Sequence, residues 1–140
     1  MKILALVLSI LIMSCTATAQ TEQSSGVPLS INKIETHRVK DHVVRIIKHN
    51  MEIAPKIELE LIKTPELTIQ DYVTITSAKT TDREYVFKKS DGVFVEAIKV
   101  KGEEIQITFE YYVPKGSAIT LDCKVLVSEK GFNQMLCDEN

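Results

Sequence analysis

Apolar and polar side chains alternate over two segments near the C-terminal end of the chain. In residues 105–113 an apolar or aromatic residue occupies every second position, and residues 119–127 repeat the pattern with Cys123 in the apolar series. A period of two places alternate side chains on opposite faces of a β-strand. Turn-forming residues separate the segments at 114–117. The pattern predicts two antiparallel strands with one buried face, and Cys123 on the core side.

An Asp-Gly pair at 91–92 lies between two further strand-like segments, 84–89 and 93–100. Asp-Gly is typical of a two-residue hairpin turn, because both central residues of that turn need a positive φ. The register that such a turn imposes puts Glu84 opposite Lys99, and pairs of opposite charge favour a register. The sequence therefore predicts a hairpin between these two segments.

A Lys-Gly pair at 101–102 indicates a second reversal of the chain. As a two-residue turn it would place Lys99 opposite Glu104 and join 93–100 to 105–113. Together with the Asp-Gly hairpin, this turn predicts a meander of three strands.

The N-terminal half carries weaker strand patterns. Residues 56–62 alternate, with their apolar side chains on one face, and residues 72–76 are rich in β-branched and aromatic side chains. Residues 29–36 are a further candidate strand. Each of these segments has the length of an ordinary strand.

Residues 41–50 fit two structures. Their apolar residues suit a strand, but together with Val39 and Met51 they also suit one face of a helix. Most of these apolar residues are β-branched, and the surrounding segments are strand-like. We therefore predict a strand here, with a helix as the alternative.

About eight short strands, with turn signals every 8 to 12 residues, predict an all-β fold. The expected architecture is an antiparallel β-sandwich, immunoglobulin-like in outline, formed by a single domain over 27–140. The hallmark of antibody-type domains is missing. The chain has no tryptophan, and its two C-terminal cysteines lie too close in sequence to bridge opposite sheets.

The N-terminus has the three parts of an export signal. Lys2 supplies the positive charge, 3–13 form an apolar run, and 17–19 read Ala-Thr-Ala. The apolar run is shorter than the roughly 20 residues that span a bilayer. We expect residues 1–19 to be a cleaved signal peptide and 20–26 a flexible leader. The mature protein would then be exported, either to a periplasm or outside the cell.

Residues 12–15, Ile-Met-Ser-Cys, allow an alternative reading of the same segment. They resemble a bacterial lipobox, in which the cysteine is acylated and becomes the new N-terminus. Met13 is larger than the residue that usually stands at that place. If Cys15 is acylated, the protein is anchored to an envelope membrane, and otherwise no membrane association is expected.

Either reading removes Cys15 from the free thiols and leaves Cys123 and Cys137. An even pair in an oxidising compartment predicts one disulfide. The closed loop of about fifteen residues would contribute about 3 kcal/mol of stability. The bond would fasten the C-terminal tail to a strand whose cysteine faces the core.

Charge disfavours one class of partner. The chain has 17 basic and 19 acidic side chains, a net charge of −2, and no long block of either sign. Proteins that bind nucleic acids normally need a basic field to neutralise phosphates. We therefore expect no nucleic-acid partner.

All three histidines, His37, His42 and His49, lie within one short span. On a strand His49 would share a face with Met51. An imidazole beside a soft thioether suits copper, so a small periplasmic copper carrier is the alternative function. Two ligands alone make a weak metal site. Ordinary structural roles account for these histidines and for Met51, so we expect no cofactor.

Catalytic motifs are missing, since neither Gly-x-Ser-x-Gly nor His-Glu-x-x-His occurs. Glu58 and Glu60 fall on the polar face of an alternating strand, where solvated carboxylates discourage edge-to-edge pairing. We expect a non-enzymatic protein. A hydrolase would need a site assembled from distant residues, with a histidine touching both a nucleophile and a carboxylate.

Tyr111 and Tyr112 are adjacent, so on a strand their rings point to opposite faces. Strand parity places Tyr112 outside, with Phe94 as a candidate companion. An exposed tyrosine offers a large contact area at small entropic cost. We therefore predict a binding surface at Tyr112 and Phe94.

Export, a disulfide, a β scaffold and the lack of catalytic motifs lead to one function class by exclusion. We expect a non-enzymatic protein that binds another macromolecule, most simply a protein, in the cell envelope or outside the cell. Inhibitors, immunity proteins and assembly accessories are of this type.

Overall fold

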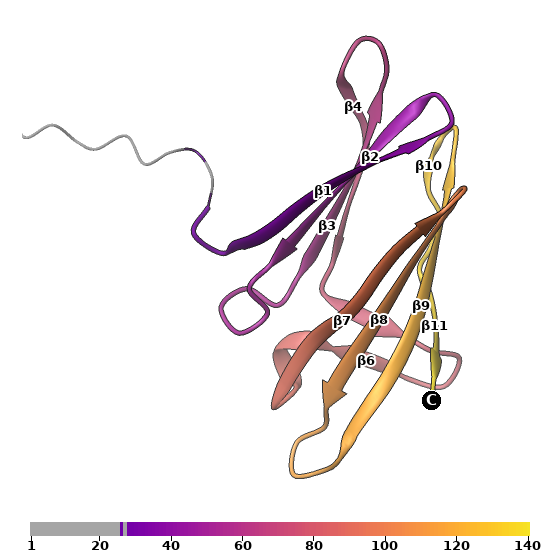
Figure 1. Ribbon diagram of the computed structural model, residues 1–140. Helices are drawn as coiled ribbons and strands as arrows, with labels where there is room; N and C mark the ends of the chain where they lie inside the picture. The colour runs from indigo at the N-terminus through magenta and orange to yellow at the C-terminus, as the bar shows by residue number, and fades with distance from the viewer. Residues whose placement is uncertain (1–25, 27) are drawn as a thin grey trace, which may run out of the picture.

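The computed structural model describes residue 26 and residues 28–140. They form two antiparallel sheets that face each other, together with one small hairpin and one turn of 3₁₀ helix (Figure 1). The all-β sandwich that the strand patterns predicted is confirmed. The signal peptide, most of the leader and Cys15 lie outside the described residues.

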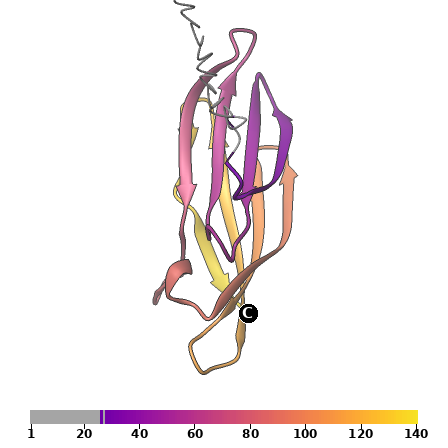
Figure 2. The same ribbon diagram turned by 90° about the vertical axis from the view of Figure 1, so that its left-hand side faces the viewer.

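Sheet 1 is built from the first four strands in the order in which they occur: β1 (Ile31–Val39), β2 (His42–His49), β3 (Ile57–Lys63) and β4 (Thr68–Ile75). Figure 2 shows these strands side by side. Residues 42–49 are therefore a strand, as predicted, and not a helix. The apolar residues of 56–62 that were expected to point inward are fully buried: Ile57, Leu59 and Leu61.

Sheet 2 contains β7 (Gly92–Lys101), β8 (Glu104–Tyr112) and β9 (Ala118–Ser128). The short strands β10 (Gly131–Phe132) and β11 (Leu136–Glu139) follow one another along the free edge of β9. The predicted antiparallel pairing of 105–113 with 119–127 is confirmed as β8 with β9. Their alternation is confirmed too, since Cys123 is buried among apolar side chains.

The core lies between the two sheets and takes side chains from both, among them Ile46 and Leu59 of sheet 1 and Phe109 and Leu121 of sheet 2. The likeness to immunoglobulins extends to the two-layer architecture alone. Strands adjacent in sequence are adjacent throughout sheet 1 and from β7 to β10 in sheet 2, so the two sheets are consecutive meanders, and β11 returns to the edge of β9. An immunoglobulin domain uses Greek-key connections instead.

One side of the sandwich is closed by contacts between β4 and β10. The Asp71 carboxylate accepts a hydrogen bond from the backbone N–H of Phe132 at 2.8 Å. The side-chain amide of Gln70 donates to the carbonyl of Glu129. These contacts hold the edge of sheet 1 against the edge of sheet 2.

The predicted hairpin at Asp91-Gly92 is wrong. Residues 84–86 form β6 (Glu84–Val86), which pairs with β5 (Ser77–Lys79), so Glu84 faces Lys79 rather than Lys99. A 3₁₀ turn, η1 (Phe87–Lys89), separates β6 from β7. The chain therefore crosses from one side of the sandwich to the other between β4 and β7, with the β5–β6 hairpin on the way.

Burial of Phe87 explains why the hairpin does not form. Its ring is almost completely buried and packs against Phe109, with ring centroids 4.9 Å apart. The hydroxyl of Ser90 then caps the turn by donating to the Phe87 carbonyl at 2.7 Å. Asp91 donates its N–H to the carbonyl of Tyr112, so it starts the pairing of β7 with β8. Tertiary packing thus outweighs a local turn preference.

The second turn joins the expected strands in a different register. Lys101 faces Glu104, and Lys99 faces Gln106, which moves the predicted pairing by two residues. Gly102 has a φ of +59° and takes the first loop position, where its freedom from a Cβ is needed. Because the shift is even, inward side chains stay inward.

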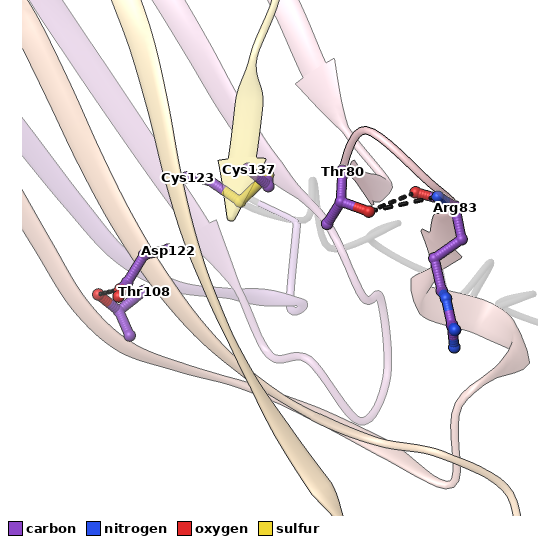
Figure 3. The surroundings of a disulfide bond; sticks show 6 residues. All are labelled: Thr80, Arg83, Thr108, Asp122, Cys123 and Cys137. Atoms are coloured by element: carbon purple, nitrogen blue, oxygen red, sulfur yellow. Dashed lines mark hydrogen bonds between the residues drawn. A yellow bond between two sulfur atoms is a disulfide. The ribbon is translucent and has the colours of Figure 1, made fainter. Parts of the chain in front are cut away.

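The predicted disulfide between Cys123 and Cys137 is present (Figure 3). The two cysteines are directly opposite each other on β9 and β11, and both are buried. The bond therefore fastens the last strand to sheet 2. Within the described residues, no helix has the length and apolar character needed to cross a membrane.

Candidate functional site

Phe94 and Tyr112 lie together on the outer face of sheet 2. Their ring centroids are 5.8 Å apart and their planes meet at 86°, an edge-to-face contact. Gly92 faces Tyr112 and Phe94 faces Glu110, so the two rings are diagonal neighbours on β7 and β8. Phe94 is 42% exposed and Tyr112 36%. The binding role predicted for the two residues stays a prediction.

The aromatic pair packs over the backbone of Gly92. A Cβ at that position would lie 3.4 Å from Cε2 of Phe94 and 3.9 Å from Cδ2 of Tyr112. The rings therefore cover the backbone of a glycine at the start of an edge strand. This arrangement compensates for the missing side chain, because aromatic neighbours shield an exposed glycine.

Phe94 also borders a cavity at one end of the sandwich. The cavity has a volume of about 540 Å³ and lies between the loop that follows β2 and the segment that leads into β7. We call it the end pocket, and its apolar lining consists of Met51, Ile53, Pro55, Phe87, Val93 and Phe94. Glu52, Lys88 and Asp91 add charges of both signs at its border.

Ile53 is the member of this site that the sequence analysis missed. It is 71% exposed, although it is a large aliphatic residue. The signal that could have found it is its position, an isoleucine in the short loop between two predicted strands. Singly exposed aliphatic residues are common on protein surfaces, so the feature that distinguishes Ile53 is its place in the lining of the end pocket.

The hydroxyl of Tyr112 remains protonated over the physiological range. A hydrogen bond with the Glu110 carboxylate is the main cause that raises the pKa of Tyr112, and partial burial and the negative charge of Glu110 add to it. Burial raises the pKa of the neighbouring Tyr111 as well. The site therefore presents a neutral phenol near a cavity whose lining is both apolar and charged.

His49 is 2% exposed and lies between a hydroxyl and a carboxylate. Its Nδ1 is 2.9 Å from Oγ of Ser30, and its Nε2 is 3.3 Å from Oε2 of Glu58. The second contact is close enough for attraction, but Nε2 makes no hydrogen bond of good geometry. These are the groups that the hydrolase hypothesis required, and that hypothesis stays a prediction.

Met51 does not share a strand face with His49. β2 ends at His49, and Met51 lies in the turn beyond it, where it lines the end pocket. The parity argument behind the copper hypothesis is therefore wrong. Copper binding itself stays a prediction.

The three histidines do not form one cluster. His37 pairs across the sheet with Val44, and His42 contacts the side chain of Gln70 at 2.9 Å, so both sit toward the opposite end of β1 and β2 from His49. Among residue 26 and residues 28–140, no three His, Cys, Asp or Glu side chains are arranged to hold a metal ion.

The expectation that Glu58 and Glu60 are solvated is wrong. Glu60 is buried and paired with Arg45, and Glu58 is mostly buried and paired with Lys56. Burial alone would raise the pKa of Glu58, but the hydrogen bond from Lys56 and the nearby side chains of His49 and Tyr72 outweigh burial and leave the pKa below its usual value. These carboxylates are structural ion pairs on a central strand.

Comparisons with known proteins give no relative. No protein-family model, no curated protein and no solved structure matches this chain.

Proposed function

We propose that this chain is an exported, non-enzymatic β-sandwich that binds another protein in the cell envelope or outside the cell. The contact surface is the end pocket together with Phe94 and Tyr112. The observation that carries the proposal is an exposed aromatic pair at the border of a cavity whose lining is both apolar and charged.

The chemistry of this end of the sandwich suits a protein partner. Protein interfaces are enriched in aromatic residues at their centres, with polar groups around them. A cavity of about 540 Å³ has room for one or two apolar side chains of a partner. The Tyr112 hydroxyl donates to Glu110, so its oxygen can accept a hydrogen bond from a backbone N–H of a partner, and Ile53 adds apolar area.

The proposed compartment rests on two features. The N-terminal residues have the composition of an export signal, and the Cys123–Cys137 bond is compatible with an oxidising environment. Such a bond stabilises a domain by constraining its unfolded chain.

Site-specific photo-cross-linking in the native host tests the proposal. A benzophenone amino acid replaces Ile53 in one variant and Leu126 in a control variant. Leu126 is also exposed but lies far along sheet 2 from the pocket. We expect one defined protein adduct from position 53 and none from position 126.

A second change makes the experiment specific to the aromatic pair. Adding Phe94→Ala and Tyr112→Ala to the position-53 variant should remove the adduct, while the melting temperature changes little because both rings are partly exposed. Equal adducts from positions 53 and 126, or an adduct that persists without the aromatic pair, would contradict the proposed surface.

A further inference from the structure

Ser30 lies just before β1, and its hydroxyl contacts a histidine. The distance from its Oγ to Nδ1 of His49 is 2.9 Å. Ser30 is partly exposed and its neighbour Leu29 is fully exposed, so a reagent in solution can approach it. The other serine hydroxyls that donate hydrogen bonds within residues 28–140 contact a carboxylate or a backbone carbonyl: Ser77, Ser90 and Ser128. Among the described serines, Ser30 is thus the one whose hydroxyl is hydrogen-bonded to an imidazole.

Backbone contacts fix the position of Ser30 against the end of β2. The next residue, Ile31, faces His49 across the sheet, and the register shifts by one residue between Ile31 and Lys33. The Ser30 carbonyl accepts a hydrogen bond from the N–H of Asn50 at 2.6 Å. His49 is only 2% exposed, so packing holds its ring in place. The hydroxyl and the imidazole are therefore positioned by the fold itself.

Glu58 of β3 is the third member of this cluster. Its Oε2 is 3.3 Å from Nε2 of His49, and its Oε1 accepts a hydrogen bond from the ammonium of Lys56. Burial opposes ionisation, but Lys56, His49 and Tyr72 outweigh it and keep the pKa of Glu58 below its usual value. The carboxylate is therefore charged at neutral pH. We call Ser30, His49 and Glu58 the serine cluster.

The charge of Glu58 decides which nitrogen of the neutral His49 ring carries the proton. An ionised carboxylate can only accept hydrogen bonds, so the proton lies on Nε2, toward Glu58. Nδ1 then has a free lone pair, and the Ser30 hydroxyl donates its hydrogen bond to it. The contact between His49 and Glu58 is long, as such contacts often are before a substrate binds. In this state the imidazole can take the proton of the hydroxyl.

We propose that Ser30 is a nucleophilic serine that accepts an acyl group from a carboxylic ester, with His49 as its general base and Glu58 as the positioning residue. A nucleophile, a base within hydrogen-bonding reach and a third group that orients the base form the arrangement that activates hydroxyl groups. Oγ of Ser30 forms a bond to the carbonyl carbon of the ester while its proton moves to Nδ1 of His49. The C–O bond of the ester then breaks, and the leaving alcohol takes the proton from Nδ1.

This chemistry is separate from the proposed contact surface. None of the three residues of the serine cluster lines the end pocket. Transfer of one acyl group to Ser30 needs no turnover, so it is compatible with a binding protein. Repeated release of the acyl group by water would extend the same chemistry to a hydrolase, and would replace the non-enzymatic part of the proposed function.

Acetylation of the purified mature protein by p-nitrophenyl acetate tests the proposal. Peptide mass spectrometry locates the acetyl group, and Ser117, an exposed serine in the loop before β9, is the internal control. We expect Ser30 to be acetylated at least about a hundredfold faster than Ser117, as general-base assistance allows. Glu58→Gln should slow the acetylation of Ser30 by at least about tenfold, because it removes the charge that keeps the imidazole proton on Nε2.

A thiol variant gives an independent measurement that leaves the buried His49 in place. Ser30→Cys puts a thiol beside the imidazole, and a neighbouring histidine lowers the pKa of a thiol. In mildly acidic buffer, iodoacetamide should therefore alkylate Ser30→Cys at least about tenfold faster than Ser117→Cys, although position 117 is the more exposed. The native pair Cys123 and Cys137 is joined in a disulfide and does not react.

Three results would overturn the proposal. The first is acetylation of Ser30 that is no faster than that of Ser117. The second is an unchanged acetylation rate in a Glu58→Gln variant that melts as a folded protein. The third is equal alkylation of the thiols introduced at positions 30 and 117. Ser30→Ala should leave the photo-cross-linked adduct from position 53 unchanged, so failure of this proposal can be distinguished from failure of the proposed binding function.

Discussion

The hydroxyl of Tyr85 donates a hydrogen bond to the carboxylate of Glu139. The tyrosine belongs to β6 and the glutamate to the last strand, β11, so the contact joins the small hairpin to the C-terminal end of sheet 2. Burial is the main cause that raises the pKa of Tyr85, and the Glu139 carboxylate adds to it. The tail is therefore held by this contact as well as by the disulfide.

Tyr85→Phe removes this hydrogen bond while keeping the buried ring. A hydrogen bond to a charged group contributes about 1.5 to 3 kcal/mol, and solvent near Glu139 reduces that value, so we expect a loss of about 1 kcal/mol. Urea unfolding of both proteins measures it. An unchanged midpoint would show that the contact does not stabilise the tail, and Glu139→Gln serves as the matched partner variant.

Replacing Cys123 and Cys137 together by alanine should destabilise the domain by about 3 kcal/mol, because the unfolded chain is no longer constrained by a closed loop. The parent should lose stability on addition of dithiothreitol. The double variant should melt at the same temperature with and without the reductant. If reduction leaves the melting temperature of the parent unchanged, the bond has no stabilising role.

Glu58 makes stability depend on pH. Its folded-state pKa lies below the unfolded value of about 4.3, so its contribution is present above that pH and is lost as the pH falls through the folded-state pKa. Unfolding free energies measured from pH 7 to pH 3 should therefore fall less steeply for Glu58→Gln than for the parent. Parallel curves for the two proteins would contradict this assignment.

Gly131→Ala should destabilise the junction of β4 and β10. Gly131 has a φ of +145°, and a Cβ there would clash with the carboxylate of Asp71. Backbone strain of this kind costs about 1 to 3 kcal/mol, and displacing Asp71 also weakens its hydrogen bond to Phe132. Thermal unfolding measures the loss. Gly26→Ala is the control, since nothing lies within 4 Å of a Cβ there. If Gly131→Ala and Gly26→Ala lower the melting temperature equally, the clash with Asp71 is contradicted.

Copper titration separates the carrier hypothesis from the binding function. Both ring nitrogens of His49 already face protein groups, and Met51 lies beyond the end of the strand, so we expect no tight site at these residues. Cu(I) and Cu(II) titrations of the parent and of Met51→Leu should be indistinguishable. Stoichiometric binding that is lost in Met51→Leu and in His49→Gln would establish a carrier instead.

The regular strands were predictable because their pattern is local. Alternation in 105–113 and 119–127 indicates both the pairing and the buried face. The predicted register at the turn near Gly102 was wrong by two residues, and an even shift leaves the buried face unchanged. The hairpin at 91–92 could not be excluded from the sequence. What decides against it is the burial of Phe87 against Phe109, a contact between residues far apart in the chain.

The candidate site was predictable in part. Parity along β8 places Tyr112 outside, but parity along β7 changes at an irregularity between Val95 and Ala97, so Phe94 and Lys99 share a face despite an odd separation. The contact of Phe94 with Tyr112 depends on the register between β7 and β8, which the local sequence pattern does not specify. Ile53 and the end pocket depend on how the loops fold over one end of the sandwich.

By itself, the amino-acid sequence determined the fold class, the strands with strict alternation and the pairing of Cys123 with Cys137, because these depend on side-chain period and on residue inventory. Only the tertiary structure decided the partner of β6, the burial of Glu58 and Glu60 and the surroundings of His49. The physical reason is that the alternation of apolar and polar residues shows which side chains share a face of a strand. Packing between distant segments decides which of the two faces is buried, and by what.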